Sequence, residues 1–66
     1  MNQENRRKVA SQSIVDIRAV CQTLIEIRAR LDTNDPAGRH ISLAITHLED
    51  ARMRIDEALY TGMSNG

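Results

Sequence analysis

The sequence predicts an all-α protein, an antiparallel two-helix hairpin that assembles into a helical homo-oligomer. Two long segments carry apolar residues three and four positions apart, the spacing of one face of an α-helix. The segment DTNDPAG lies between them and contains residues that interrupt helices. The chain of 66 residues has no Trp, no Phe and a single Tyr, so its core must be aliphatic.

The first helix is expected over about residues 4–31. At about 100° per residue, its apolar side chains fall in one arc roughly 160° wide. That arc holds Val9, Ala10, Ile14, Ile17, Val20, Cys21, Leu24, Ile25, Ile27 and Leu31. A single neighbouring helix covers only part of so wide an arc. The margin from Val9 and Ile27 round to Ile25 therefore needs a second partner.

The link between the helices is expected to reverse the chain within a few residues. Asn34 can adopt the left-handed conformation that ends many helices. Asp35 is a natural N-cap, and Pro36 suits the first turn of the next helix. Because Gly38 weakens a first turn, regular helix is expected from Pro36 or only from Arg39. A link this short brings the helices back antiparallel.

The second helix is expected over about residues 37–61, with Gly62 as its stop and a flexible tail over residues 62–66. Leu43, Met53 and Tyr60 lie off its main apolar stripe, on the flank. That stripe holds Ala37, Ile41, Ala44, Ile45, Leu48, Ala51, Ile55, Ala58 and Leu59. We interpret residues 1–66 as a single helical-hairpin domain.

Self-association is the stabilising device that the composition leaves open. Chains this short usually need disulfides, a metal or oligomerisation. Cys21 is the single cysteine, which excludes an internal disulfide and suits a reducing compartment. No set of four zinc ligands is visible, and His40 and His47 are too far apart to chelate a metal as a pair. We therefore expect an oligomer with no metal and no cofactor.

The charge balance limits the possible partners. Nine basic residues offset nine acidic ones, which disfavours binding to polymeric nucleic acid. The longest apolar runs are only a few residues, so no membrane span is expected. The segment MNQENRRKVA has no hydrophobic region after its charges, unlike a secretory signal. We expect a cytoplasmic protein.

Arg28 and Arg52 fall within the apolar arcs of the two helices, where an unpaired guanidinium is costly. Each can extend its guanidinium to solvent, or pair with Asp56, Glu49 or a neighbouring subunit. Alternatively, each is a cationic group at a subunit seam that binds a phosphate.

Other polar residues also have two interpretations. Arg18 lies at the margin of its apolar arc and is either solvated or a phosphate ligand. The cluster Arg6, Arg7 and Lys8 opposes the dipole of a helix start, and is either a solubilising end or a phosphate contact. Thr46 can bond back to the preceding turn. No Ser, Cys or His has an activating partner in the sequence, so we do not expect an enzyme.

The segment AGRHISLAITHLEDARM, followed by ALY, resembles a family of small phage helical hairpins. This family is the anti-CBASS cyclic-oligonucleotide sponges, whose hairpin is shared with the anti-Thoeris signal sponges. The close match covers about a third of the chain, and IVDIRAV in the first helix matches more loosely. The matching positions are Gly38, Arg39, Ser42, Leu43, Ala44, Thr46, Leu48, Glu49, Ala51, Met53, Ala58 and Leu59.

The resemblance implies a non-catalytic sponge that sequesters cyclic dinucleotides, cyclic trinucleotides or both, and so blocks bacterial anti-phage signalling. It also implies a homohexamer with ligand pockets between protomers, acting in the host cytoplasm if the protein is phage-encoded. Arg18 and Arg39 are similar to the family's basic residues, and Ser42 and Thr46 could supply hydroxyl contacts. Arg28 and Arg7 are the further ligand-binding candidates.

Two other functions fit the same residues. One is a helical protein–protein interaction module without a nucleotide ligand, which would use exposed side chains such as Leu43 and Met53. The other is a small nucleic-acid-binding regulator, which the neutral charge disfavours.

Overall fold

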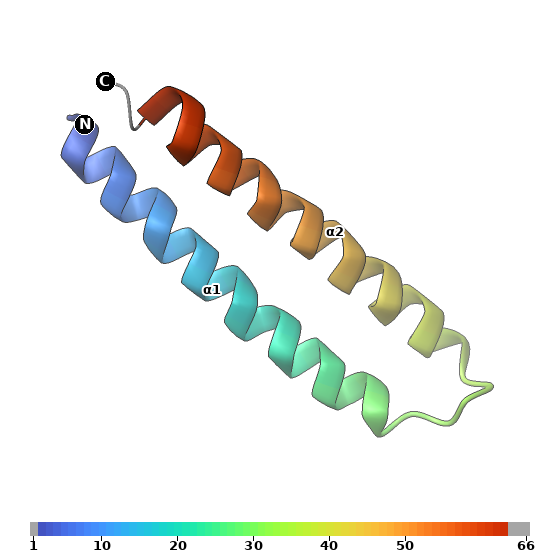
Figure 1. Ribbon diagram of the computed structural model, residues 1–66. Coiled ribbons are helices and arrows are strands. Elements are labelled where there is room, and N and C mark those ends of the chain that lie inside the picture. Colours follow the sequence, from blue (N-terminus) through green and yellow to red (C-terminus); the bar gives the residue numbers. More distant parts are fainter. Residues whose placement is uncertain (1, 64–66) are drawn as a thin grey trace.

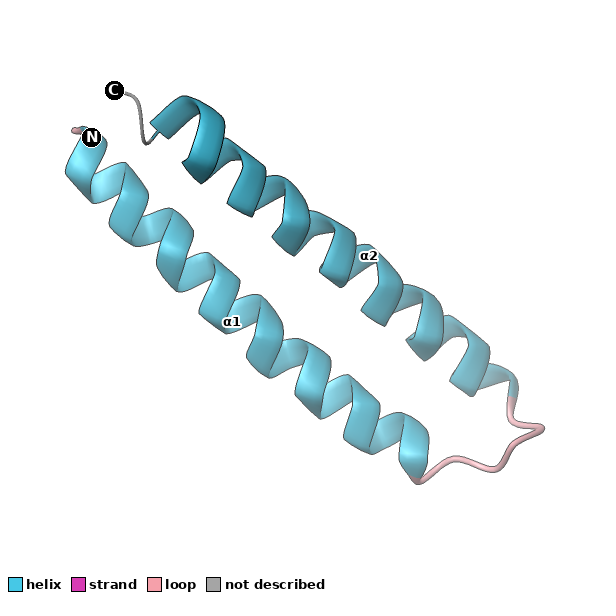
Figure 2. Ribbon diagram, in the orientation of Figure 1, coloured by secondary structure: helices cyan, strands magenta, loops and turns pink. Residues whose placement is uncertain are grey.

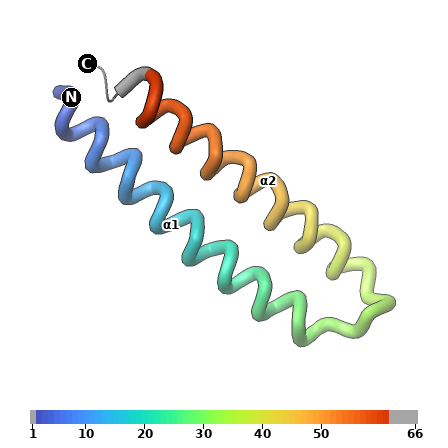
Figure 3. Tube along the Cα trace, viewed as in Figure 1, coloured from blue at the N-terminus to red at the C-terminus, as the bar shows by residue number. Residues whose placement is uncertain are grey.

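The protein is a two-helix hairpin in the computed structural model, which describes residues 2–63 and the side chains of residues 2–61. Helices α1 (Gln3–Ala29) and α2 (Pro36–Ala58) run antiparallel, and a π-helical turn, η1 (Leu59–Met63), continues α2 (Figure 1). The described residues are helical apart from Asn2 and the short link, as the sequence predicts (Figure 2). The hairpin measures 48 × 16 × 14 Å. The start of α1 and the end of α2 lie at the same, open end, opposite the link (Figure 3).

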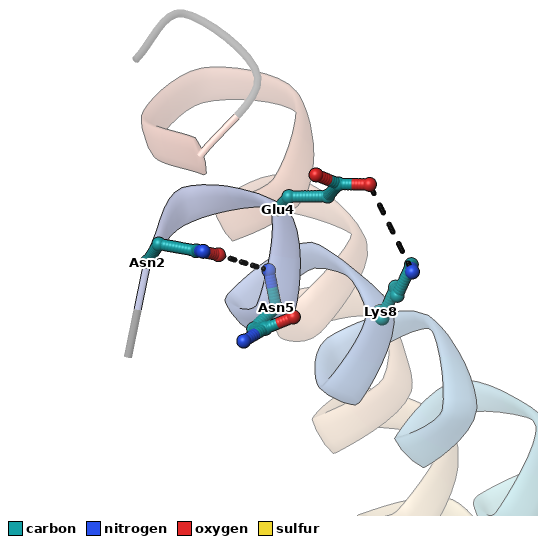
Figure 4. A network of polar contacts seen from close by, with 4 residues as sticks. All are labelled: Asn2, Glu4, Asn5 and Lys8. Carbon is teal, nitrogen blue, oxygen red and sulfur yellow. Dashed lines mark hydrogen bonds and ion pairs between the residues drawn. The ribbon is translucent and has the colours of Figure 1, made fainter.

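The start of α1 is capped by local polar contacts. The side chain of Asn2 accepts a hydrogen bond of 2.8 Å from the backbone N–H of Asn5. Glu4 lies in the first turn and its carboxylate is 3.8 Å from the ammonium of Lys8 (Figure 4). The cap satisfies one of the free N–H groups of the first turn and explains why α1 begins at Gln3.

The link turns without the left-handed residue predicted at Asn34. No non-glycine residue in the described chain has a positive φ. Instead, the backbone N–H of Arg30 donates to the carbonyl of Ile27 at 3.0 Å, and that of Leu31 donates to Arg28 at 3.2 Å. These short-range bonds satisfy the last carbonyls of α1, so no left-handed cap is required. They also end α1 at Ala29, slightly before the predicted boundary at residue 31.

The start of α2 has the predicted cap. The carboxylate of Asp35 accepts a hydrogen bond of 2.9 Å from the backbone N–H of Ala37, and Pro36 is the first helical residue. The later of the two expected starts, Arg39, is wrong. The N–H of Gly38 donates to the carbonyl of Asp35 at 3.0 Å, so Gly38 already belongs to the helix. The cap and this bond offset the helix-weakening effect of glycine.

Gly38→Ala is expected to stabilise the helix by about 0.5–1 kcal/mol, because alanine is the better helix former. A Cβ atom built at Gly38 meets nothing within 4 Å in the hairpin. Thermal unfolding followed by circular dichroism at a fixed protein concentration measures the effect. A lower melting temperature would contradict this prediction and would mean that another molecule occupies the space beside Gly38.

The hairpin has almost no interior. Ile45 is the only buried residue among those described, with 6% of its surface exposed, and α1 has no buried residue. The other apolar side chains of the contact layer are only half-buried: Ala10, Ile14, Ile17, Cys21, Leu24 and Leu31 before α2, and Ile41, Ala44, Leu48, Ala51, Ile55, Ala58 and Leu59 in α2 and η1. This thin contact layer follows from an aliphatic chain of this length folded as only two helices.

Large apolar side chains remain on the outside of the hairpin, as the width of the predicted arcs indicates. Val9, Ile25 and Ile27 on α1 are 53%, 38% and 41% exposed. The α2 flank carries the same kind of surface, at Leu43, Met53 and Tyr60. The hairpin alone therefore leaves uncovered the margins for which the sequence predicts a second partner.

The end of α2 differs from the predicted stop at Gly62. The chain remains helical through η1, which ends at Met63, so the predicted helix stop at Gly62 is wrong. The hydroxyl of Thr61 donates to the carbonyl of Glu57 at 2.7 Å within this continuous turn. Residues 64–66 of the predicted tail lie outside the described residues. No helix in the described chain has the length and apolarity needed to cross a membrane.

Candidate ligand-binding site

Arg28, Arg39 and Ser42, three of the six predicted site residues, meet at the link end of the hairpin. They line one surface hollow of about 400 Å³, here called the loop-end hollow, together with residues 31–35 and Gly38. The guanidinium Nη1 of Arg28 donates a hydrogen bond of 3.2 Å to the Ser42 hydroxyl. This bond joins α1 to α2 and holds the Arg28 side chain over the hollow.

The guanidinium groups near the hollow are available to an anion. Within residues 2–61, no carboxylate lies within 4.0 Å of the guanidinium nitrogens of Arg28 or Arg39. Arginine donates to phosphate oxygens through two parallel N–H groups, which suits both side chains to phosphate. Asp32 and Asp35 also line the hollow, so its formal charge is balanced within one copy.

The first turn of α2 contributes less to anion binding than a free helix N-terminus would. Helix N-termini attract anions through unpaired N–H groups. Here the carboxylate of Asp35 already accepts from the N–H of Ala37, and Pro36 has no N–H. A phosphate at this end would therefore be held mainly by arginine side chains.

Thr46 lies one turn after Ser42 on α2 and does not line the loop-end hollow. Its hydroxyl donates to the backbone carbonyl of Ser42 at 3.1 Å, which is the back-bonding that the sequence suggests. The hydroxyl proton is thus engaged, while the oxygen can still accept a hydrogen bond. Thr46 can therefore serve a ligand as an acceptor beside the hollow.

Arg18 lies in a separate groove in the middle of the hairpin. This mid-hairpin groove has a volume of about 210 Å³ and is lined by Arg18, Cys21, Gln22, Ile25, Glu49 and Arg52. Two guanidiniums and one carboxylate give it a formal charge of +1. No ion pair of 4.0 Å or less joins Arg52 to Glu49 or Asp56 in the described residues, so the pairing considered for Arg52 is not formed within one copy.

Arg7 lies near the open end of the hairpin. It lines a shallow hollow made by α1 alone, beside Glu4, Lys8 and Ser11. At 1.5 Å per residue, Arg7 and Arg28 are about 30 Å apart along α1. One copy therefore does not bring Arg7 to Arg28, Arg39 and Ser42.

Four of the six predicted residues, Arg7, Arg18, Ser42 and Thr46, nevertheless border one side of the hairpin. Residues 7, 18 and 25 fall on one stripe of α1, and residues 42, 46 and 49 fall on one stripe of α2, because residues at these spacings project from the same helix face. Arg18 and Ile25 from the first stripe and Glu49 from the second line the mid-hairpin groove. The two stripes therefore border the same side of the molecule.

Gln22 and Arg52 are polar residues of this side that the predicted site lacks. Both line the mid-hairpin groove with Arg18. Gln22 is one turn from Arg18, so the helical spacing could have identified it. Arg52 is half-buried. Its position within the apolar arc of α2 had already indicated that its guanidinium could lie at a subunit seam.

The comparisons with known proteins assign this hairpin to a family. The family model described as the Acb2/Tad1 hairpin domain matches residues 4–60, which include both helices and the link. No curated protein and no solved structure gives a significant match. The match spans most of the chain and agrees with the resemblance carried by the second helix. The chain belongs to the Acb2/Tad1 hairpin-domain family.

Proposed function

We propose that this protein is a non-catalytic sponge for the cyclic oligonucleotide messengers of bacterial anti-phage signalling. It binds cyclic dinucleotides, cyclic trinucleotides or both between copies of the hairpin, in the cytoplasm of the host. The main supporting observation is the loop-end hollow, where Arg28, Arg39 and Ser42 converge in a chain of the Acb2/Tad1 family.

The chemistry of the hollow matches the phosphates of such a ligand. Each phosphate carries one negative charge and oxygens that accept two parallel N–H bonds from a guanidinium. Arg28 is held in place by Ser42, so part of the entropy cost of ordering its side chain is already met in the free protein. Exposed apolar residues and the planes of arginine side chains can pack against the bases.

The ligand is expected to bind where two copies meet. Pockets for small ligands typically enclose about 70–90% of the ligand surface. The loop-end hollow is a surface depression on a rod only 16 Å wide, so one copy cannot enclose a dinucleotide. A two-fold seam would close the hollow and present two copies of each arginine to the two phosphates of a cyclic dinucleotide.

We propose a homohexamer as the functional assembly, on the basis of the family resemblance and the uncovered apolar surface. Val9, Ile25 and Ile27 leave the outer margins of α1 apolar, and Leu43 and Met53 do the same on α2. Copies that cover these residues would remove apolar surface from water. In such an assembly, Arg18 and Arg7 of one copy can approach a site formed by another.

Binding of an intact ligand is the test of this proposal. Calorimetry with a panel of cyclic dinucleotides and trinucleotides is expected to give saturable binding, and mass spectrometry is expected to recover the ligand unchanged. A linear dinucleotide with the same bases is the matched control and is expected to bind more weakly. Absence of binding across the panel, or recovery of a cleaved ligand, would contradict the proposal.

A protein–protein interaction module is the second candidate function. It is supported by the exposure of Leu43 and Met53, 47% and 58%, on the outer side of α2. This function predicts that Leu43→Glu abolishes binding to a partner protein and that no cyclic nucleotide of the panel binds. The panel of cyclic nucleotides separates the two candidates.

A further inference from the structure

Two surfaces at the open end of the hairpin are partly apolar and carry opposite charge. The first, here called the Val9 hollow, has a volume of about 400 Å³. Its apolar lining comes from both helices, and its charged lining consists of two guanidinium groups without a carboxylate. The residues concerned are Val9, Ala10, Ile55 and Ala58, with Arg6 and Arg54.

The second surface, here called the Met53 surface, has a hollow of about 620 Å³ lined by Met53, Asp56, Glu57, Tyr60 and Thr61 of α2 and η1. Met53 and Tyr60 are 58% and 81% exposed, and they are the apolar part of this surface. The charged part is two carboxylates without a cation. The Met53 surface therefore has the apolar character of the Val9 hollow and the opposite charge.

One copy cannot bring the two surfaces into contact. Met53 and Tyr60 are seven residues apart and project from one stripe of α2. Arg54 and Ala58 are four residues apart and project from another stripe, rotated by about 100°. Both surfaces are at the open end, but they face different directions.

The charges of the two surfaces are not paired within one copy. Arg6 lies near the N-terminus of α1, where the helix dipole disfavours a cation. Asp56 and Glu57 lie in the last turn of α2, before η1, and that turn has no basic residue. No ion pair within one copy involves Arg6, Asp56 or Glu57 in the described chain. A contact with another molecule would provide these charges with partners.

We infer that the Met53 surface of one copy packs against the Val9 hollow of a second copy. The apolar side chains meet, and Asp56 and Glu57 lie against Arg6 and Arg54. This inference deepens the assembly in the proposed function, and it rests on that proposal only for the statement that copies join. In this contact each copy presents the Met53 surface to one neighbour and the Val9 hollow to the next, so the interface is heterologous, and it forms a ring where the rotation between copies closes.

The contact also sets the direction of neighbouring hairpins. Val20 and Ile27 lie on the same stripe of α1 as Val9 and are 48% and 41% exposed. Side-by-side hairpins with their open ends together cover this whole stripe, whereas hairpins that point away from each other cover only its first part. The copies in the ring therefore run parallel.

Charge exchange tests the interface. One variant combines Asp56→Arg with Glu57→Arg, and a second combines Arg6→Glu with Arg54→Glu. Each places like charges on both surfaces and is expected to lower the mass measured by sedimentation at least twofold. A fourfold variant with all four substitutions restores opposite charges and is expected to recover the wild-type mass.

Matched controls separate the local contact from a change in net charge. Glu26→Arg with Asp50→Arg changes the net charge as the first variant does, at exposed positions outside both surfaces, and is expected to keep the wild-type mass. The fourfold variant also addresses folding, because recovery of mass requires helices that still form. Wild-type mass in either double variant, or a low mass in the fourfold variant, would overturn the inference.

The outcome is distinguishable from failure of the proposed function. Calorimetry with the same cyclic dinucleotides on the wild-type assembly reports ligand binding independently of the interface. If the fourfold variant recovers the mass and no cyclic nucleotide binds, the interface is correct and the sponge function is wrong. If the ligands bind and neither double variant loses mass, the sponge function stands and the interface is wrong.

Discussion

Arg39→Ala is expected to lower the affinity for a cyclic dinucleotide by about 100-fold or more. A hydrogen bond to a charged group contributes about 1.5–3 kcal/mol, and a two-fold seam loses two such contacts, one from each copy. A loss of about 3 kcal/mol corresponds to roughly 100-fold in Kd. The measurement is calorimetry with one cyclic dinucleotide at constant ionic strength.

Arg30→Ala is the matched control for this prediction. Arg30 is exposed, follows α1 directly and lines none of the hollows described here. Its loss removes the same charge from the same end of the hairpin, so affinity is expected to change little. Arg39→Lys is expected to bind with intermediate affinity, because lysine keeps the charge but lacks the planar pair of donors. Equal affinity of Arg39→Ala and the wild type would contradict this role of Arg39.

Ile45→Ala is expected to cause the largest loss of stability of any truncation to alanine. Ile45 is the only buried residue in the described chain, and truncation of a buried Ile to Ala costs about 2–5 kcal/mol. For a domain of about this size, each kcal/mol shifts the melting temperature by roughly 4–8 °C. Thermal unfolding at a fixed protein concentration should therefore show a decrease of about 10 °C or more.

Val15→Ala is the corresponding control at an exposed position. Val15 is 56% exposed, and alanine has the higher helix propensity, so the melting temperature is expected to stay nearly constant. A similar decrease in both variants would mean that Val15 is also buried, and would place a neighbouring copy on the outer side of α1.

The spacing of apolar residues predicted most of the fold. Two arcs with a 3.6-residue period and one short interruption define two antiparallel helices, and Asp35 and Pro36 predicted the start of the second. The ends were harder to predict because several local hydrogen bonds compete there. Asn34 could have formed a left-handed cap, but the bonds from Arg30 and Leu31 already satisfy the carbonyls. Gly38 was expected to delay the start of the second helix. The helix nevertheless begins at Pro36, because Asp35 caps its first turn.

The candidate site was only partly predictable from the sequence. Arg28, Arg39 and Ser42 come together because the link places the end of α1 beside the start of α2. The helical period places Arg18 on the side of the hairpin that Ser42 and Thr46 border, but it does not show which residues of different copies come together. Arg7 is at the far end of the molecule, so its place in a shared site depends on the arrangement of the assembly. That arrangement depends on surfaces of different copies, which a periodic pattern in one chain does not encode.

Molar mass measured together with helix content tests the central claim that hairpins join to form the ligand site. Light scattering and circular dichroism are recorded on the same sample over a range of concentrations. The account predicts a helical species whose mass is a multiple of 7.4 kDa, with helix content that falls as dilution dissociates it. A particle of 7.4 kDa that remains fully helical at every concentration would contradict the claim.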